Sequence, residues 1–538
     1  MIDFFYRTEE IKVDEVKNYF VETKQDRIII EQLKARNPVL LVGSRGVGKS
    51  FLFRVAEAEL LAEIHALKTL PVYVTFRKSS LIHTTNSSQF QYWMLARICH
   101  EVLRTLSKNG VMAVLPASLS ILAGETIKVG LTKKTKIEQI ADSFEESWQD
   151  PGKAIDTKGL PTIDSFLDAI EDVCVNTGIN RIVVFIDEAA HIFVPEQQRQ
   201  FFTLFRDLRS PYITCNAAVY PGVTSYGDTF QPIHDASVVL LNRDFQDDSY
   251  VKHMKEIVLK QLDDSSLIKN IARRGENFAI LAYAASGNPR NLLKTVSRTP
   301  KMDSESINKI IREYYRTEIW AEHSGLSDKY PGHRVLVDWG RKFIEGEVLP
   351  ELQNKNNQYL ADDKKTTCFF WMHRDIPQPV KEALRLLEYT GIVTLHSTGI
   401  KATRSEIGIR YAVNFGCIMA QEAAPASVGL AIANNVTPKR MSEYGSNHKS
   451  FESLMSEVPN FSEPNMSTTL SMLLAQDIAV LDLTPWQMER LRLLNLHTVG
   501  NVLTATELML QQVQYVGEKR ARLIRNAAIA AVYEYLSG

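Results

Sequence analysis

The sequence predicts an α/β fold in which a parallel β-sheet carries helices on both faces and smaller domains follow. Short apolar runs rich in β-branched residues alternate with helical patterns through the first half of the chain, an order typical of strands joined by helical crossovers. These runs lack polar alternation, which indicates strands covered on both faces. A glycine-rich loop follows the first run and precedes a helical pattern, which suits a loop at the edge of such a sheet.

The elements of the first half follow from these runs. The apolar patterns predict strands over 38–42, 71–76, 181–186, 212–219 and 236–241. Helical spacing predicts helices over 26–36, 51–65, 89–106 and 163–175. Between 110 and 160 the periodicity weakens, which indicates an insertion. From 245 to 320 the pattern is almost wholly helical, and we expect a helical lid behind the sheet.

Length and composition exclude several classes of protein. The 538 residues correspond to three or four domains at roughly 150 residues each. A net charge of −1 rules out a polyelectrolyte, so a nucleic-acid surface would have to be a local patch. Five scattered cysteines without CxxC spacing argue against disulfides or zinc. With no signal-peptide pattern and no apolar stretch near the ~20 residues of a membrane span, we expect a cytoplasmic protein without membrane contact.

The glycine-rich loop carries the strongest chemical signal. It consists of Gly43, Ser44, Arg45, Gly46, Val47, Gly48, Lys49 and Ser50. This order matches GxxxxGK[ST], the P-loop pattern, between an expected strand and an expected helix. Backbone N–H groups of such a loop point at phosphates, Lys49 would reach the β- and γ-phosphates, and the Ser50 hydroxyl would ligate Mg²⁺. The loop therefore predicts binding of ATP, or a closely related nucleoside triphosphate, with Mg²⁺.

A second signal is the acidic pair Asp187-Glu188, which directly follows the apolar run 181–186. After a P-loop, a strand that ends in two acids predicts Asp187 in the Mg²⁺ shell and Glu188 as the residue that orients the attacking water. The plain alternative is a strand that ends in a polar turn.

The third signal is the segment 286–290, Ser-Gly-Asn-Pro-Arg, at the start of an expected helix. Proline suits the first turn of a helix, and Arg290 would project from that turn toward the phosphates. A solvated arginine at a helix start is the alternative.

Together the three signals resemble the AAA+ ATPases, closest to the origin-recognition/initiator clade and the related STAND signalling ATPases, over about residues 20–320. The resemblance implies that Arg290 is a sensor 2 residue. Two features depart from the pattern. Thr224 is a weak stand-in for sensor 1, and residues 220–235 contain no arginine finger. The substitutes Arg206, Arg209 and Arg243 cannot be told apart, so activation by a neighbouring subunit is an open question.

The second half indicates further domains. A helix over 380–387 followed by runs at 391–395 and 409–414 is typical of a winged helix, with Lys401, Arg404 and Arg410 near its wing; a packing domain is the alternative. The expected domains are 1–243 (ATPase core), 244–325 (helical lid), 326–420 (winged-helix-like), 421–477 (linker, partly disordered) and 478–538 (helix–hairpin–helix).

The C-terminal residues resemble the helix–hairpin–helix class, especially the C-terminal domain of the bacterial RNA polymerase α subunit. Gly517 would permit the tight turn, and the free N–H groups of the next helix would bind a DNA phosphate. The expected DNA-binding residues are Gly517, Lys519, Arg520, Arg522 and Arg525. A helical module for a protein partner is the alternative.

These features predict an ATP-hydrolysing switch that binds DNA, in an initiator-like, transposition or phage-defence role. The alternative is a STAND-like scaffold whose C-terminal modules bind protein partners, and a homo-oligomer fits either hypothesis. A P-loop kinase is disfavoured because neither a helical lid nor the added modules serve phosphoryl transfer to a small molecule.

Overall fold

The computed structural model divides the chain into two compact units, which we describe separately. The first unit contains Met1–Arg243, Lys252–Asp264 and Asn288–Leu293; the second contains Asp244–Val251, Ser265–Gly287 and Lys294–Gly538. The structure describes residues 4–78, 88–110, 116–125, 134–147, 155–189, 195–227, 229–329, 333–403, 405–457, 474–481, 483–513 and 515–537.

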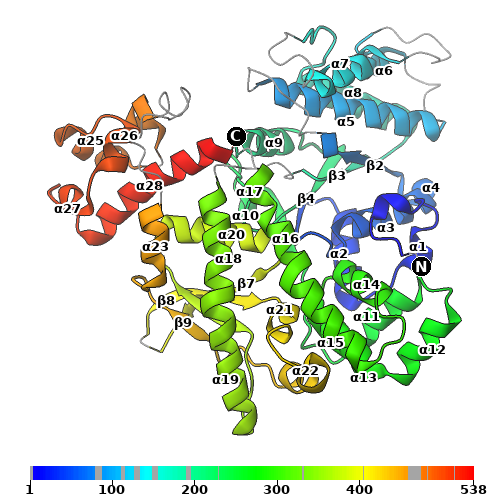
Figure 1. Cartoon of the computed structure of the whole chain (residues 1–538). Helices are drawn as coiled ribbons and strands as arrows, with labels where there is room; N and C mark the ends of the chain where they lie inside the picture. Colours follow the sequence, from blue (N-terminus) through cyan, green and yellow to red (C-terminus); the bar gives the residue numbers. More distant parts are fainter. Residues whose placement is uncertain are drawn as a thin grey trace. The chain divides into compact units, whose positions relative to one another are not determined.

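The first unit is built on a five-stranded sheet in the order β2-β3-β4-β1-β5, with every neighbouring pair parallel (Figure 1). The strands are β1 (Val39–Val42), β2 (Thr69–Thr75), β3 (Arg181–Asp187), β4 (Ile213–Val219) and β5 (Ser237–Leu240). Each lies within two residues of a run predicted from the sequence. The predicted parallel α/β fold is confirmed.

Helices cover both faces of this sheet. They are α1 (Val16–Tyr19), α2 (Lys24–Lys34), α3 (Lys49–Ala62), α4 (Ile64–Leu67), α5 (Ser88–Lys108), α6 (Pro116–Ala123), α7 (Lys136–Glu145), α8 (Ile163–Thr177), α9 (Pro195–Asp207) and α10 (Pro232–Asp235). Alternate strand residues enter two separate cores: Leu40 and Val184 join the one with α5, α8 and α9, while Leu41 and Val183 join the one with α2 and α3. This explains why the strands read as continuous apolar runs.

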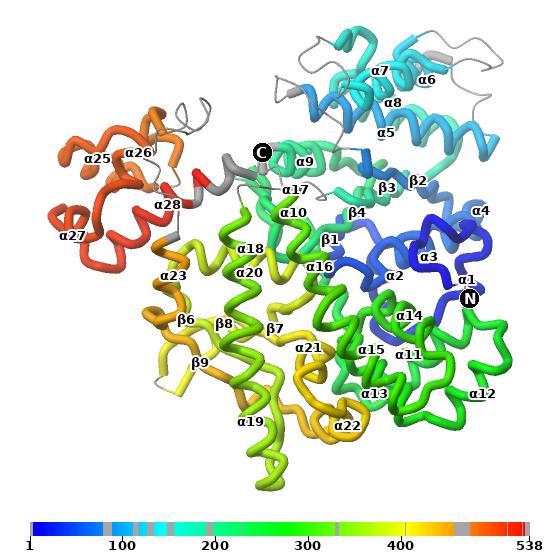
Figure 2. Tube along the Cα trace, in the orientation of Figure 1, coloured from blue at the N-terminus to red at the C-terminus, as the bar shows by residue number. Residues whose placement is uncertain are grey.

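The segment from 110 to 160 is part of the folded core rather than a loose insertion, as far as the structure describes it. Leu119 of α6 and Ile140 of α7 are buried in the same core as the sheet. The short helix η1 (Thr8–Glu10) and α1 contact α3, so the N-terminal segment runs beside the helix that follows the P-loop (Figure 2).

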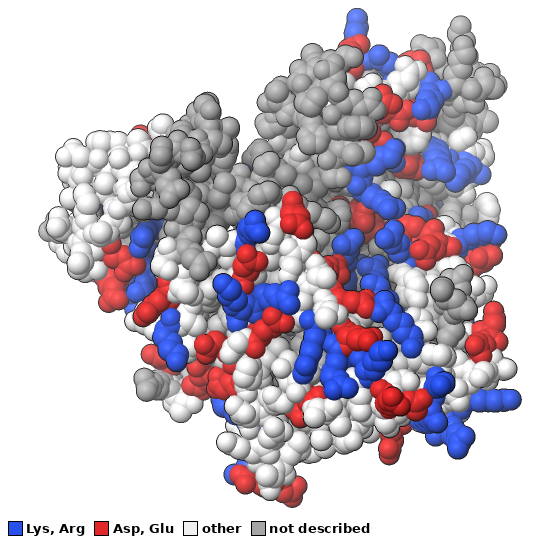
Figure 3. All heavy atoms as spheres, viewed as in Figure 1, with Lys and Arg blue, Asp and Glu red and all other residues white. Residues whose placement is uncertain are grey.

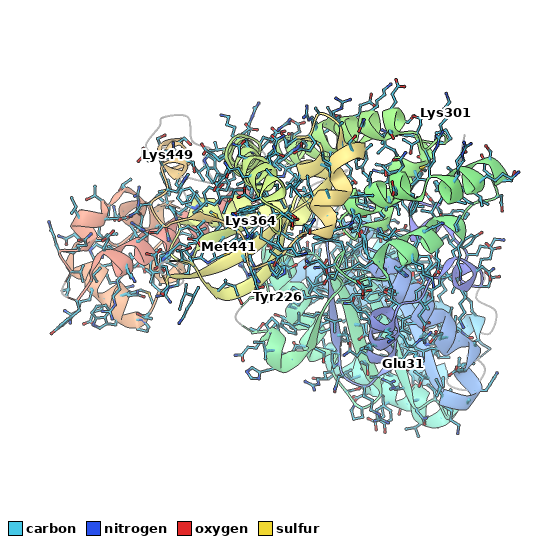
Figure 4. All side chains as sticks on the ribbon, turned by 90° about the horizontal axis from the view of Figure 1, so that it is seen from below. Glu31, Tyr226, Lys301, Lys364, Met441 and Lys449 are labelled. Carbon is cyan, nitrogen blue, oxygen red and sulfur yellow. The ribbon has the colours of Figure 1, made fainter. Side chains whose placement is uncertain are left out.

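An ion-pair network joins α2 to α3. Lys34 Nζ lies 2.8 Å from carboxylate oxygens of both Glu31 and Glu59, and Arg27 lies 3.0 Å from Glu59. Figure 4 labels Glu31 on this side of the first unit. Because the network is shared among several charges, it constrains the helices more than one exposed pair would.

The second unit begins with the expected helical region. The helices of this region, parts of which belong to the first unit, are α11 (Tyr250–Leu259), α12 (Ser265–Arg273), α13 (Gly275–Ala284), α14 (Pro289–Ser297), α15 (Ser304–Glu313), η5 (Tyr314–Glu318), α16 (Ile319–Ser324), α17 (Leu326–Lys329), α18 (Arg334–Phe343), η7 (Ile344–Val348) and α19 (Leu349–Ala361). The boundary between the units passes through α11 and α14.

A four-stranded sheet follows, in the order β7-β8-β6-β9. Its elements are β6 (Phe369–His373), α20 (Gln378–Thr390), β7 (Val393–Lys401), β8 (Ile407–Val413) and β9 (Ser442–Tyr444). The predicted order of helix and antiparallel hairpin is present in α20, β7 and β8. β6 and β9 extend the hairpin into a sheet.

The expected linker over 421–477 differs from the structure in its first part. α21 (Phe415–Met419) leads to α22 (Pro425–Asn434), β9 and α23 (Ser450–Glu457). The backbone of this stretch is tied to the residues before β6: Thr366 Oγ1 donates to Ile432 O of α22 at 2.7 Å, and Thr367 Oγ1 donates to Arg440 O at 2.6 Å. Residues 458–473 lie outside the described residues.

The last part of the second unit is helical. It comprises η8 (Ile478–Val480), α25 (Pro485–Leu493), α26 (Val499–Thr504), α27 (Glu507–Leu510) and α28 (Glu518–Ser537). Among the described residues, no helix has the length and apolar character needed to cross a membrane.

Candidate functional site

The P-loop lies in the first unit between the buried strand β1 and helix α3. Gly46 has a φ of 89° and Gly48 a φ of 105°, values that glycine adopts without the cost a side chain would add. A Cβ on Gly46 would stand 2.8 Å from Asn288 Oδ1. The motif therefore requires glycine here both for backbone conformation and for close approach of a second segment.

Lys49 is the first residue of α3 and is buried, with 7% of its surface exposed. Its Nζ donates to Gly43 O and to Ser44 O, the second at 3.1 Å, and lies 4.1 Å from the centre of the Tyr220 ring. Burial lowers the pKa of Lys49 to about 7, against the opposing charge of Asp187. An anion bound inside the loop would favour the charged ammonium, so the lysine is suited to phosphate.

Asp187 ends β3 at the same edge of the sheet and is almost fully buried. Tyr73 Oη donates to its Oδ2 at 2.5 Å, and the Glu188 backbone N–H donates to its Oδ1 at 2.9 Å. Burial, followed by the charge of Asp187, raises the pKa of Tyr73 well above its usual value, so the phenol stays a donor. Since β4 lies between β1 and β3, Asp187 and the P-loop stand two strands apart at the carboxyl edge.

Glu188 has a φ of 56°, a left-handed conformation that is uncommon for a residue with a side chain. Its Oε2 is buried and has no hydrogen-bond partner among the described residues. Burial, followed by the charges of Asp187 and Glu9, raises the pKa of Glu188 to about 7. A carboxyl group with an unused oxygen and a near-neutral pKa, on a residue whose backbone is strained, is suited to accept a proton.

The segment after residue 287 brings the third motif to the P-loop, within the first unit. Asn288 Nδ2 donates to Arg45 O at 2.8 Å. Arg290 lies beside Gly46, whose added Cβ would be 3.0 Å from Arg290 Cβ, and its Nε donates to Tyr6 O at 3.1 Å. The structure thus gathers Lys49, Asp187, Glu188 and Arg290 around one loop.

The residue expected in the sensor 1 position lies differently. Thr224 Oγ1 donates to Tyr220 O at 2.6 Å, and Tyr220, directly after β4, is the residue that contacts Lys49. We therefore replace Thr224 by Tyr220 as the residue that follows β4 into the site. Tyr220 could not be predicted from the sequence, because AAA+ proteins often have asparagine or threonine at this position.

The three substitute arginines are also distinguished. Arg243 is 11% exposed, donates to Val47 O, and pairs with Asp26 at 3.4 Å, so it braces the P-loop of its own chain. Arg206 donates to Thr229 O at 2.8 Å and pairs with Asp207. Arg209 is exposed at the end of α9. Arg243 is thus excluded as a finger for a neighbouring subunit, while Arg206 and Arg209 remain candidates.

The donor set fits a nucleoside triphosphate with Mg²⁺. The loop offers curled backbone around a buried ammonium that contacts two loop carbonyls and the face of the Tyr220 ring. The Ser50 hydroxyl and the Asp187 carboxylate are hard oxygen ligands of the kind that Mg²⁺ takes together with phosphate oxygens. Among the described residues, no cluster of three or more His, Cys, Asp or Glu offers a separate metal site.

The predicted DNA-binding residues near Gly517 are less uniform. Lys519 and Arg520 are exposed, whereas Arg522 and Arg525 are half-buried. Arg522 lies 3.4 Å from Glu518 and 3.6 Å from Glu507, and Lys519 lies 3.8 Å from Asp375. Acidic neighbours therefore compete with a phosphate for two of these cations. On the face seen in Figure 3, acidic and basic side chains are intermixed.

The turn itself corrects one expectation. The positive φ of 67° falls on Tyr515, and Gly517 has no left-handed φ. Gly517 is thus not needed for the turn. A Cβ at this position would meet no atom within 4 Å, so the backbone before α28 is open.

The cations expected near the wing also differ from one another. Lys401 is exposed, whereas Arg410 donates to Pro438 O at 2.7 Å. Arg404 lies outside the described residues.

Comparison with known proteins gives one family and a weak structural likeness. A family model described as ORC-CDC6-like matches residues 4–366, more than half of the chain. No curated protein matches the sequence. Among solved structures, the chain is similar to the Orc1 protein of Aeropyrum pernix in complex with DNA, at 11% identity over 76% of this chain and 93% of that chain, with a TM-score of 0.31.

Proposed function

The chain belongs to the ORC-CDC6-like family, and from that premise we propose that it is an ATP-binding and ATP-hydrolysing switch that binds DNA. The observation that carries the proposal is the convergence of Lys49, Asp187, Glu188 and Arg290 on one P-loop in the first unit. Each of these residue types serves a separate need of triphosphate hydrolysis, and their coincidence at one edge of the sheet is hard to explain as packing.

The roles follow from the contacts. Lys49 exchanges the carbonyls of Gly43 and Ser44 for phosphate oxygens. Ser50 and Asp187 would hold Mg²⁺, which when bound supplies positive charge to the phosphates. Glu188 orients a water, and its raised pKa suits transient acceptance of a proton. Arg290 lies against Gly46 and would contact the γ-phosphate of a bound nucleotide. Because Arg290 is part of α14, the position of this helix would then depend on whether the γ-phosphate is present.

The DNA part of the proposal is carried by surfaces of the second unit. The open backbone before α28, with Lys519 and Arg520 exposed beside it, supports a phosphate contact of the helix–hairpin–helix kind. The α20, β7 and β8 order supports a winged helix, with Lys401 on its wing. An initiator-like role accords with the family; transposition and phage defence are finer alternatives that share the same chemistry.

A second candidate function is a STAND-like scaffold that binds a protein partner. Exposed apolar side chains favour it: Leu508 is 76%, Tyr515 71% and Leu523 57% exposed, all close in sequence to the basic turn. Acidic neighbours of Lys519 and Arg522 point the same way, because they weaken a phosphate site.

Two measurements test the proposal. Lys49→Ala should weaken ATP binding by about 100-fold or more, because it removes the buried cation. The control Lys134→Ala changes an exposed lysine that is paired with Asp142, and it should leave ATP binding unchanged. ATP binding by Lys49→Ala at the level of the unchanged chain would refute the site.

Titration of duplex DNA at several salt concentrations, with ATPase activity followed in parallel, separates the two candidate functions. The DNA proposal predicts a DNA affinity that falls steeply with salt, and the scaffold hypothesis predicts no DNA affinity.

A further inference from the structure

The Asp187 carboxylate is held in place from a neighbouring strand. Thr75 of β2 lies directly opposite Asp187 of β3, and Tyr73 lies two residues earlier, opposite Phe185. Residues two apart on a strand share a face, so Tyr73 is the diagonal neighbour of Asp187. Its phenol reaches along that face and donates to Oδ2 at 2.5 Å, while Oδ1 accepts from the Glu188 backbone. Both carboxylate oxygens therefore have a fixed donor.

Tyr73 is itself held from the other side by Arg54 of α3. The Arg54 Cζ atom lies 3.3 Å from the centre of the Tyr73 ring, and Arg54 Nη1 lies 2.7 Å from Glu57 Oε2. A guanidinium stacked on an aromatic face is a favourable and oriented contact. Glu57 fixes the guanidinium, so the ring has little freedom to turn away from Asp187.

This pair joins the two halves of the magnesium site. Arg54 is four residues after Ser50 in α3, so the two side chains lie on one face of the helix. The chain of contacts therefore runs from the helix that carries Ser50, through Arg54 and Tyr73, to the strand end that carries Asp187. No motif predicted it, because Tyr73 reads in the sequence as one more apolar strand residue.

We propose that Tyr73, braced by Arg54, is a positioning residue that sets the orientation of the Asp187 carboxylate for Mg²⁺ bound with nucleotide. The inference rests on the proposed function of the P-loop. Mg²⁺ demands near-ideal octahedral geometry and tolerates little misplacement of a carboxylate. Groups that orient metal ligands typically change metal affinity by about 10- to 100-fold when they are lost.

The test is nucleotide binding of the full chain in EDTA and across a Mg²⁺ titration, for Tyr73→Phe and for the unchanged chain. Tyr73→Phe removes one hydroxyl and keeps the ring under Arg54. We expect the ATP affinity of Tyr73→Phe in EDTA to stay within about twofold of that of the unchanged chain. The Mg²⁺ concentration that gives half of the Mg²⁺-dependent increase in ATP affinity should rise about tenfold. Tyr92→Phe, which removes the hydroxyl of a 39% exposed tyrosine on α5, should behave as the unchanged chain.

Other outcomes count against the inference. An unchanged Mg²⁺ requirement in Tyr73→Phe would overturn it, and so would an equal loss of affinity in EDTA and in Mg²⁺, which would mark Tyr73 as general packing. Arg54→Lys keeps the charge without the planar stack and should show a smaller shift in the same direction, which keeps the inference testable if Tyr73→Phe folds poorly. If the unchanged chain binds no ATP in either condition, the proposed function itself fails.

Discussion

Two glutamates, one in each unit, have a buried carboxyl oxygen and the same electrostatic signature in very different surroundings. Burial raises the pKa of both Glu188 and Glu388 to about 7. Each also has one carboxyl oxygen without a hydrogen-bond partner among the described residues, Oε2 in Glu188 and Oε1 in Glu388. A perturbed carboxyl is often taken as the mark of a functional site, and here the same mark occurs twice.

The surroundings separate them. Glu188 follows Asp187 at the edge of the sheet where Lys49 and the P-loop lie, and its backbone is left-handed. Glu388 lies in the last turn of a regular helix, α20, and the Leu395 backbone provides its hydrogen bond. Burial is the largest cause of the raised pKa in both residues, and the charges of Asp187 and Glu9 add to it in Glu188. Only the convergence of other reactive groups gives Glu188 a chemical role.

The largest expected effect is the loss of ATP hydrolysis when Glu188 is replaced. Glu188→Gln keeps the shape and removes the proton acceptor, so ATP hydrolysis should fall by about 100-fold or more, while ATP affinity stays within about twofold. Single-turnover hydrolysis and equilibrium binding measure the two separately. Glu9→Gln is the matched control, because Glu9 is an exposed carboxylate whose charge acts on Glu188; its turnover should change less than about threefold. Normal turnover in Glu188→Gln would end the assignment.

The parts of this site that depend on local sequence could be predicted, and the parts that depend on distant contacts could not. The P-loop and Asp187-Glu188 are short motifs joined to apolar strands, so their chemistry and their position at a strand end are readable together. Tyr73 acts on Asp187 from 114 residues away, and Arg243 pairs with Asp26 from 217 residues away. Such partners have no spacing that a single sequence reveals.

The fold shows the same division. The five apolar runs of the first unit became its five strands; β1, β3 and β4 are buried on both faces, while β5 at the edge of the sheet is partly exposed. β9, Ser442–Tyr444, has no such run and exists only because β6 provides a paired edge. α22 is built from small residues, Pro425–Asn434, a composition that also suits a linker. Its place in the fold depends on tertiary contacts such as that between Thr366 and Ile432.

The Glu388 side of the comparison predicts a stability effect instead of a catalytic one. Because the folded pKa lies above the ordinary value near 4.5, the folded state holds the proton more tightly than the unfolded state. The stability that Glu388 contributes is then fully present below pH 4.5 and is lost as the pH rises toward 7, by about 1–3 kcal/mol. Glu388→Gln should abolish this loss, measured as the opening free energy of α20 amides by hydrogen exchange at pH 5 and pH 8.

Glu382→Gln on the same helix is the control, since Glu382 pairs with Arg385 near the surface. It should keep the pH dependence. ATP hydrolysis by Glu388→Gln should stay within about twofold of the unchanged chain, and a loss comparable to that of Glu188→Gln would show that the two carboxyls do not differ in the way their surroundings indicate.

The smallest expected effect concerns the exposed cations of the second unit, where no burial amplifies a charge. Replacing Lys519 and Arg520 together by alanine should weaken duplex DNA binding by about three- to tenfold near 0.1 M salt and lower the salt slope by about two, the share of two phosphate contacts. The double variant Lys301→Ala, Lys309→Ala removes two other exposed cations of the same unit (Lys301 is labelled in Figure 4). An equal loss in that variant would indicate a general effect of net charge, and the proposed contact at the turn would then be wrong.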